Sequence, residues 1–395
     1  MILKKIIAKA VKDSRGEKTI LVGVVNSAGK VFETSAPAGK SKGKFEVKSY
    51  FKSLSGDIKF LNGLNVSVVN GLKLKRFDDL VNIEKLVSGK IGGNSLFALE
   101  ASILKAIAFD KGVELYEFLD GVVARRKKGK KGINIRPVGN TIGGGLHSKG
   151  VKGKKPEFQE FLFIAKGKNF KERVKINETA YVLARKFLKS RSRNDEGAWE
   201  TGCSNEEVLD IMSNVRKIMK KKGLVVDIGL DVASSSFLKN KKYVYWNNRL
   251  SQSSQINYLI KLIQEYKILY VEDGLDENDF SGFRKLMLKG KFLNVGDDLT
   301  TTNLKRVKKA IRMNSINAMI IKPNQIGSLI EVKEVIAICR ANKIKTIISH
   351  RSGETLDNTI ADLGVGFNVD FIKTGVYGDV RKSKLKRIIE IEGKL

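Results

Sequence analysis

Residues 268 to 299 read ILYVEDGLDENDFSGFRKLMLKGKFLNVGDDL. The segment opens with a short apolar run at 268–271, passes through a longer stretch of mixed polarity, and returns to an apolar run at 292–295. Short apolar runs that alternate with longer helical segments are typical of a parallel sheet covered by helices. Glu272 follows the first run and Asp297 follows the second. The segment is therefore one repeated unit of apolar run, acidic residue and connecting stretch.

The same alternation continues through the C-terminal two thirds of the sequence. Seven apolar runs recur there, at residues 161–165, 225–230, 268–271, 292–295, 318–321, 346–348 and 371–372. The roughly 265 residues from position 131 onward have room for seven or eight strand–helix units, which is the size of a closed α/β barrel. No GxGxxG opens a strand–helix turn, so a dinucleotide-binding fold lacks its glycine fingerprint.

The first 130 residues have a different pattern, which predicts a smaller α+β domain. Residues 1–60 read as strands and turns, with a flexible Gly/Ser/Lys loop at 36–44, and residues 76–120 read as helices. The basic stretch RRKKGKKG at 125–132 looks like a linker. We therefore predict an N-terminal domain over 1–130 and a C-terminal barrel domain over 131–395.

Polar side chains flank nearly every apolar run of the predicted barrel. Glu160 precedes the first run, and the later runs lead to Asp231, Glu272, Asp297, Lys322, His350 and Lys373. The spacings of these six residues are 41, 25, 25, 28 and 23 positions, about one strand–helix unit per step after a longer first step. The carboxyl ends of barrel strands meet at one face, where active sites lie. A single acid after a strand is usually a helix N-cap, but six polar residues in register indicate a functional site.

The residue types at this face indicate its chemistry. Three carboxylates from neighbouring strands form an oxygen-rich set that suits Mg²⁺ better than Zn²⁺. Two lysines at the same face suggest catalysis on an anion. A lysine can also serve as a base when nearby cations depress its pKa. A structural ion pair is the alternative for each lysine. The run His350-Arg351-Ser352-Gly353 supplies donors suited to a phosphate.

The composition is globular and strongly basic. Lys+Arg number 74 and Asp+Glu 42, which gives a net charge of +32, concentrated at 125–131, 149–155 and 220–222. Such a balance favours non-specific binding of polyanions, but a solvated lysine surface is the more common reason for it. Two cysteines are too few for a disulfide framework, and no stretch approaches a membrane span or a signal peptide. We therefore predict a cytoplasmic protein without a transmembrane segment.

At these residues the sequence resembles the enolase family, the phosphopyruvate hydratases, over nearly the whole chain. The similar segments in the C-terminal half are VEDGLDENDF, VGDDLTTTNLKR, IIKPNQIGS, ISHRSGETLDNTIADL and FIKTG. Upstream, the segments DSRG, GGGLHSKG, FQEFLFIA, RNDEGA and GLDVASSSF follow in the family's order. The resemblance implies a small N-terminal α+β domain followed by an eightfold α/β barrel. It also implies reversible dehydration of 2-phosphoglycerate to phosphoenolpyruvate in glycolysis and gluconeogenesis, with two Mg²⁺ per active site.

The resemblance also implies a role for each matching residue. The ligands of the first Mg²⁺ would be Asp231, Glu272 and Asp297, and Ser41 of the mobile loop 36–44 would help to hold the second, which arrives with substrate. The catalytic residues would be Lys322 as the base, Glu196 as the acid, its partner Glu160, and the loop histidine His147. The substrate would be bound by Gln159, His350, Arg351, Ser352 and Lys373. Loss of hydroxide beside the abstracted proton needs such an acid on the far side of the substrate.

Several segments depart from the family pattern. The loop PSGASTG reads PAGKSKG, KVNQIG reads KPNQIG, and DEGG reads DEGA. The segment 147–159 is longer and rich in lysine, and the tail after KTG lacks the family's Arg-Ser-Glu run. One alternative is an enolase-derived protein that binds RNA, a membrane or a surface partner with weak or no turnover. Another is a barrel enzyme for a different phosphorylated or carboxylate substrate. The resemblance also implies a homodimer or a larger homo-oligomer.

Overall fold

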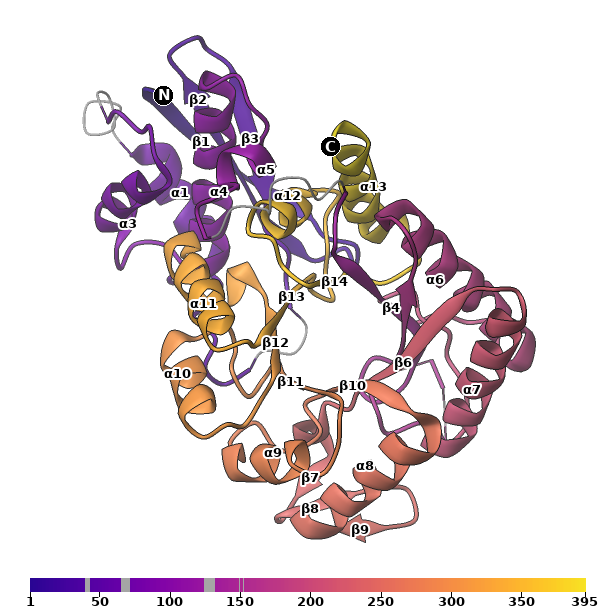
Figure 1. Ribbon diagram of the computed structural model, residues 1–395. Coiled ribbons are helices and arrows are strands. Elements are labelled where there is room, and N and C mark those ends of the chain that lie inside the picture. Colours follow the sequence, from indigo (N-terminus) through magenta and orange to yellow (C-terminus); the bar gives the residue numbers. More distant parts are fainter. Residues whose placement is uncertain (40–42, 65–71, 124–131, 149, 152) are drawn as a thin grey trace.

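A computed structural model describes residues 1–39, 43–64, 72–123, 132–148, 150–151 and 153–395. Figure 1 shows a small N-terminal part beside a ring of strands that is surrounded by helices. The predicted fold class, an α/β barrel preceded by a small α+β domain, is confirmed. The predicted domain boundary near residue 130 stays a prediction, because 124–131 lie outside the described residues.

The N-terminal domain is an antiparallel sheet covered by helices. Its sheet has the order β1 (Leu3–Lys12), β2 (Lys18–Asn26), β3 (Val31–Ser35). Its helices are α1 (Leu54–Gly63), the 3₁₀ turn η1 (Phe77–Asp79), α3 (Leu80–Val87), α4 (Gly93–Asp110) and α5 (Leu115–Leu119). Helix α4 is rich in Ala, Leu and Ile, is buried along most of its length, and packs on β2 and β3. Helix α1 begins within the stretch that reads as strands and turns, where the Ser53 hydroxyl caps it by accepting from the Gly56 amide at 3.0 Å.

Eight strands close the barrel. In spatial order they are β4 (Arg136–Gly143), β5 (Glu160–Lys166), β6 (Val225–Asp231), β10 (Ile268–Glu272), β11 (Leu293–Gly296), β12 (Ala318–Ile321), β13 (Lys345–Ser349) and β14 (Phe371–Lys373), which pairs with β4. Seven of them coincide with the predicted apolar runs to within one residue at either end. The eighth, β4, was not predicted, because its sequence RPVGNTIG carries a proline and two glycines instead of an apolar run.

The barrel is not wholly parallel, which corrects the prediction of a parallel sheet. Strand β5 runs antiparallel to both neighbours, so that Glu160, its first residue, pairs with Gly143 of β4 and Asp231 of β6. The reversal places the amino end of β5 beside the carboxyl ends of the other strands. Glu160 therefore reaches the same face as the later polar residues, although it precedes its strand run.

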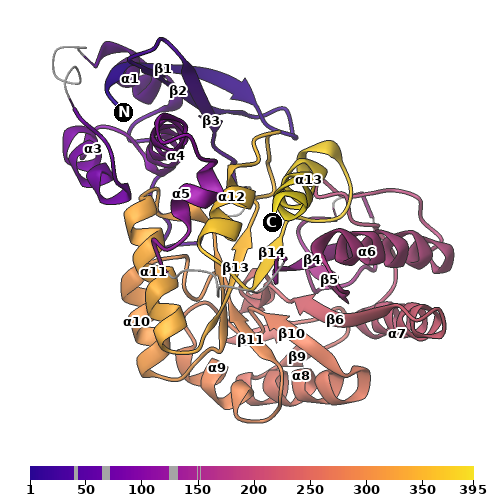
Figure 2. The ribbon, with the colours of Figure 1, turned by 45° about the horizontal axis from the view of Figure 1, so that its top comes forward.

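Helices form the outer layer of the barrel (Figure 2). They are α6 (Phe170–Ala184), α7 (Asn205–Lys221), α8 (Gln252–Tyr266), α9 (Phe280–Met287), α10 (Leu304–Arg312), α11 (Leu329–Ala341), α12 (Thr359–Gly366) and α13 (Asp379–Lys394). The shorter elements are η2 (Arg185–Phe187), η3 (Ser234–Phe237), η4 (Pro323–Gln325) and the strands β7 (Leu238–Lys239), β8 (Lys242–Val244) and β9 (Arg249–Leu250). Inside the ring, apolar side chains such as Leu162, Ile320 and Ile347 form a second, separate core. The interior of the barrel is therefore filled by side chains.

The N-terminal domain is joined to the mouth of the barrel. Ala38 and Gly353 exchange two backbone hydrogen bonds of 2.8 and 2.9 Å. The side-chain amide of Asn324 donates to the Pro37 carbonyl at 3.1 Å. These contacts fix the start of the loop 36–44 at the face where the barrel strands end, while Ser41 itself lies outside the described residues.

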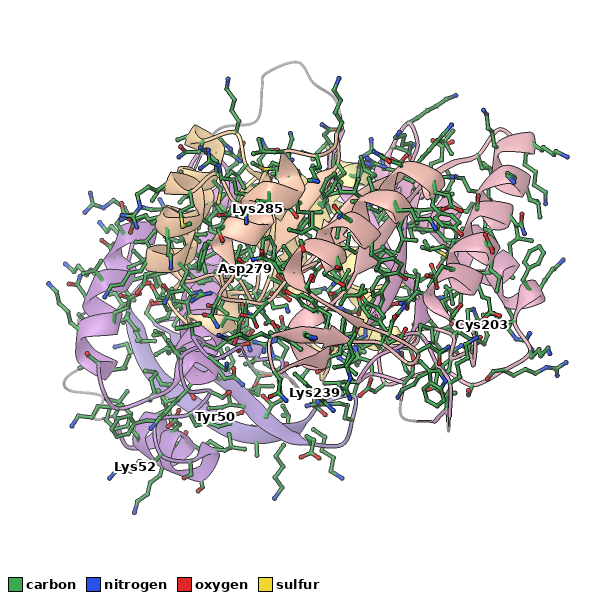
Figure 3. All side chains as sticks on the ribbon, turned by 90° about the horizontal axis from the view of Figure 1, so that it is seen from below. Tyr50, Lys52, Cys203, Lys239, Asp279 and Lys285 are labelled. Atoms are coloured by element: carbon green, nitrogen blue, oxygen red, sulfur yellow. The ribbon has the colours of Figure 1, made fainter. Side chains whose placement is uncertain are left out.

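The basic surface is spread over both domains. Lys52 of the N-terminal domain and Lys239 and Lys285 of the barrel domain are exposed, and Figure 3 shows side chains with nitrogen tips around the whole outline. Of the helices formed by the described residues, none has the length and hydropathy of a bilayer-crossing segment.

Candidate active site

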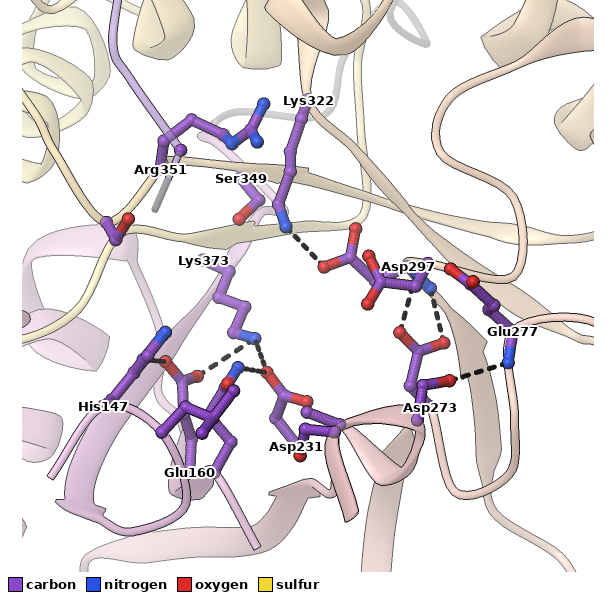
Figure 4. Close-up of a pocket in the computed structure, with 18 of the residues that line it drawn as sticks. His147, Glu160, Asp231, Asp273, Glu277, Asp297, Lys322, Ser349, Arg351 and Lys373 are labelled. Atoms are coloured by element: carbon purple, nitrogen blue, oxygen red, sulfur yellow. Dashed lines mark hydrogen bonds and ion pairs between the residues drawn. The ribbon is translucent and has the colours of Figure 1, made fainter. Parts of the chain in front are cut away.

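A pocket of about 420 Å³ lies at the carboxyl ends of the barrel strands. Figure 4 shows side chains from many strands converging on it. Among the described residues that line it, nine are Asp or Glu and four are Lys or Arg. The pocket is therefore acidic within a chain of net charge +32. Such a site needs additional positive charge when an anionic substrate enters it.

Lys373, the last residue of β14, lies at the centre of the acidic groups. Its Nζ is 2.8 Å from Glu272, 2.9 Å from Asp231 and 3.0 Å from Glu160. Burial, followed by the charge of Asp231, raises the pKa of Glu272 well above its ordinary value. Burial opposes the charge on Lys373, but these carboxylates outweigh it and raise the pKa of the lysine. Lys373 therefore remains an ammonium group.

Lys322 directly follows β12 and forms an ion pair with Asp297, which directly follows β11. Burial lowers the pKa of Lys322, but the charges of Asp297, Asp298 and Glu272 outweigh burial, and the pKa is raised. The backbone of the turn at 297–298 is fixed by Asp273, whose two carboxylate oxygens accept from the amides of Asp297 and Asp298 at 3.0 and 2.7 Å. Asp273 thus orients Asp297 toward the pocket.

A second group of side chains surrounds Glu196. One of its carboxylate oxygens lies 3.5 Å from Nδ1 of His147, and the other lies 3.7 Å from Nε2 of His350. Asn140 of β4 donates to Glu160 at 2.8 Å and to Glu196 at 3.5 Å. Burial, partly offset by Lys373, raises the pKa of Glu160 to about 7. Burial and the nearby Arg381 lower the pKa of His350 well below its usual value, so this imidazole is neutral.

The predicted phosphate contacts lie at the junction of the two domains. Arg351 forms a salt bridge with Glu46 at 2.9 Å and donates to the side-chain oxygen of Asn324 at 3.2 Å. The hydroxyl of Ser352 accepts from Arg15 at 3.4 Å. Both Arg351 and Ser352 line the pocket, so the N-terminal domain contributes to its wall. Gln159, also in the lining, donates to Asp231 at 3.4 Å.

The structure thus brings every described site residue of the sequence prediction to one pocket, with Glu272 directly beneath its lining. It also adds residues that the sequence did not reveal. Arg381 of α13 is 2% exposed and donates to His350 Nδ1 at 2.6 Å and to the carbonyls of Arg351 and Ser352 at 2.7 Å each. Arg381 is one of two arginines in a lysine-rich tail, and the sequence gave no signal of this role. Asp273 and Asp298 directly follow the predicted ligands Glu272 and Asp297 in the sequence. Each pair of adjacent acids was a usable signal for the additional residue.

The donor set fits a divalent cation. Asp231, Glu272 and Asp297 are buried. Burial raises the pKa of Asp231 and of Glu272, and the charge of Asp297 contributes to the rise in both. The Oδ1 atom of Asp297 is buried and has no hydrogen-bond partner among the described residues. Asp297, Asp298 and Asp273 also have carboxylate oxygens within 4.8 Å of one another. An oxygen-only set with an orphaned carboxylate oxygen suits a hard cation.

Two lysines of the basic segment 149–155 lie away from this pocket. Lys154 pairs with Glu207 at 3.2 Å, and Lys155 donates to the Ser148 carbonyl at 2.7 Å. Both line a separate pocket of about 380 Å³, next to Trp246. The other two lysines, at 149 and 152, lie outside the described residues.

The fold and the pocket are those of an α/β-barrel protein with an acidic, oxygen-rich site at the carboxyl face of its strands. The sequence profile for the family described as "Enolase, C-terminal TIM barrel domain" matches residues 133–395. The chain is similar to an enolase of Archaeoglobus fulgidus, at 35% identity over 99% of this chain and 97% of the relative. It is 36% identical to an enolase of Thermoplasma acidophilum over 99% of this chain and 98% of the relative. It is 37% identical to an enolase of Methanosphaera stadtmanae over 100% of this chain and 96% of the relative. The chain belongs to the enolase family, and it is a lyase.

Proposed function

We propose that the pocket catalyses the reversible dehydration of 2-phosphoglycerate to phosphoenolpyruvate, with Mg²⁺ as its metal. The observation that supports this most directly is the arrangement of Lys322 and Glu196. Both line one pocket, yet Lys322 follows β12 while Glu196 lies in a turn attached to β4, three strands away in the closed ring. A substrate between them would have a base on one side and an acid on the other.

The roles of the side chains follow from their positions. Lys322 Nζ would take the proton from the carbon next to the substrate carboxylate, and Lys373 would orient that carboxylate. Glu196 would give a proton to the leaving hydroxyl group as the carbon–oxygen bond breaks, so the products are phosphoenolpyruvate and water. His147, His350, Asn140 and Glu160 would hold the carboxyl group of Glu196, and Arg351 and Ser352 would bind the phosphate.

The carboxylates of Asp231, Glu272 and Asp297 would hold the first Mg²⁺, and Ser41, outside the described residues, would help to hold a second. When bound, Mg²⁺ would supply positive charge next to Asp297. That charge would weaken the ion pair of Asp297 with Lys322, lower the pKa of the lysine, and stabilise added negative charge on the substrate carboxylate. Without that charge, the raised pKa of Lys322 leaves it protonated and unable to accept a proton.

The test is an assay of phosphoenolpyruvate formation from 2-phosphoglycerate by its ultraviolet absorbance. We expect activity with Mg²⁺, loss of activity in excess chelator, and recovery when Mg²⁺ is restored. Absence of turnover at saturating Mg²⁺ would favour the alternative of a binding protein derived from an enolase.

Three finer points remain proposals. We expect a homodimer or a larger homo-oligomer, which light scattering coupled to gel filtration would measure. We expect a cytoplasmic location, which cell fractionation would test. Non-specific polyanion binding through the basic surface predicts affinity for single-stranded RNA that falls steeply as salt rises.

A further inference from the structure

The turn that carries Glu196 is held by its own backbone and by Asn194. The Asn194 side-chain oxygen accepts from the amides of Glu196 and Ala198, each at 3.0 Å. The Gly197 amide donates to the Asn194 carbonyl at 2.9 Å. Gly197 has a φ of +81°, which only glycine adopts without strain. These contacts shape the turn, but they do not tie it to the rest of the protein.

Trp199 ties one side of the turn to the barrel. Its backbone amide donates to the Thr141 carbonyl of β4, and its carbonyl accepts from Gly143, both at 2.9 Å. Its indole N–H donates to the Tyr181 carbonyl of α6 at 3.1 Å, and its ring stacks on the Tyr181 ring with centroids 5.1 Å apart. Trp199 is 5% exposed, so this anchor is buried.

On the other side of the Glu196 turn, Arg193 packs against two aromatic rings. Its guanidinium carbon lies 3.9 Å from the ring centroid of Trp199 and 3.9 Å from that of Tyr377, which follows β14. The Tyr377 ring also stacks near Tyr181, at 6.1 Å between centroids. The arginine therefore joins the turn to two parts of the fold, and one of them is the segment after Lys373.

The Tyr181 hydroxyl group connects Arg193 and the aromatic rings to the Glu196 turn. Nε of Arg193 donates to the Tyr181 hydroxyl at 2.8 Å, and that hydroxyl donates to the Gly197 carbonyl at 2.7 Å. Burial raises the pKa of Tyr181 to about 12, so the hydroxyl keeps the proton that this second bond needs. On the opposite side, a Cβ on Gly197 would lie 2.9 Å from the Tyr377 carbonyl oxygen. The peptide after Glu196 thus lies between Tyr181 and Tyr377 and has little room to shift.

We propose that Arg193 is a positioning residue that acts through Tyr181 to hold the Glu196 carboxyl group in place for departure of the hydroxyl group. The inference rests on the proposed role of Glu196. Proton removal by Lys322 occurs on the other side of the substrate, so loss of this support should slow dehydration and spare exchange of the substrate proton with solvent.

The experiment compares Arg193→Ala, Arg193→Lys and Tyr181→Phe with wild type. Arg193→Ala should lower kcat for dehydration by about tenfold, with KM and solvent exchange of the C2 proton changed by less than about twofold. Tyr181→Phe keeps the stacked ring and removes the hydroxyl, so it should reproduce the loss. Arg193→Lys keeps a cation between the rings and should recover part of the activity. Arg191→Ala is the matched control, because Arg191 is exposed and no contact of its guanidinium is seen among the described residues.

A double-mutant cycle with Glu196→Gln separates this inference from the proposed function. If Arg193 acts through Glu196, Arg193→Ala should reduce kcat little further in the Glu196→Gln background. Additive losses, or a parallel fall of exchange and dehydration in Arg193→Ala, would overturn the positioning role. A complete loss of exchange in Glu196→Gln alone would instead contradict the role of Glu196 as the acid, and the cycle would still report whether the two residues are coupled.

Discussion

The ammonium group of Lys373 lies 2.8 Å from both carboxylate oxygens of Glu272. The same nitrogen contacts Asp231 and Glu160, so one lysine partly neutralises three buried acids. A buried charge that loses its partner destabilises a protein by about 3–5 kcal/mol. The stability of the acidic cluster should therefore depend on positive charge from either the lysine or a bound cation.

Lys373→Met should lower the melting temperature in the presence of chelator, because three buried carboxylates lose their shared cation. Mg²⁺ should then raise the melting temperature of the variant by more than it raises that of wild type. Lys384→Met is the control, since Lys384 is also buried but pairs with Glu354 at 2.9 Å, outside the pocket lining. An equal Mg²⁺ response in Lys373→Met and wild type would argue that the metal does not bind at this cluster.

Replacing Asp231, Glu272 or Asp297 by Ala should abolish dehydration and weaken Mg²⁺ binding at least tenfold, because each change removes a charged oxygen ligand from a buried set. Isothermal titration with Mg²⁺ measures the affinity without relying on turnover. Asp210→Asn on α7 is the control, as Asp210 is exposed and accepts from the Tyr266 hydroxyl. Unchanged Mg²⁺ affinity in all three pocket variants would contradict the assigned ligands.

Lys322→Ala should stop exchange of the substrate C2 proton with deuterated solvent, whereas Glu196→Gln should retain exchange and lose most dehydration. The difference follows from the proposed roles of the two residues, Lys322 as base and Glu196 as acid on different sides of the substrate. Nuclear magnetic resonance of 2-phosphoglycerate in D₂O follows both processes in one sample. Normal exchange in the lysine variant would show that another group removes the proton.

Glu100→Gln should make the protein more stable relative to wild type as the pH rises from about 5 to 8. Glu100 of α4 is fully buried and accepts from the Leu329 amide at 2.6 Å, and burial, with the charge of Glu84, raises its pKa well above the ordinary value. The unfolded chain releases the Glu100 proton near pH 4.5 while the folded chain retains it, so wild-type stability falls as pH rises through this window. The slope is at most about 1.4 kcal/mol per pH unit.

Thermal melting across this pH range measures the effect. Glutamine keeps an acceptor for Leu329 and has no proton to lose, so its advantage over wild type should disappear toward pH 4.5. Glu178→Gln, at a half-buried residue paired with Lys382, should show no such trend. A constant difference between Glu100→Gln and wild type would mean that Glu100 is already ionised in the folded protein.

The sequence predicted the barrel because seven of its strands are short apolar runs, and the polar residues after them appear at a regular spacing. It could not predict β4, where Pro137 and Gly139 interrupt any run, or the reversal of β5, because the direction of a strand leaves no mark in its hydrophobic pattern. Contacts such as Glu46 with Arg351, which are 305 positions apart, have no local signal either. The family resemblance named the residues of the pocket, whereas Arg381, which donates to His350 from α13, required the tertiary structure.

The backbone pairing of Ala38 with Gly353 has a consequence for engineering. The two segments belong to different domains, and each supplies the other with hydrogen bonds at the rim of the pocket. A barrel joined to an unrelated N-terminal domain would lose contacts at the rim of the pocket. Arg351 would lose its salt bridge with Glu46, and Asn324 would lose the Pro37 carbonyl as an acceptor. Chimeras between relatives should therefore exchange the first forty-six residues and the 351–355 segment together, as one inherited unit that crosses the domain boundary.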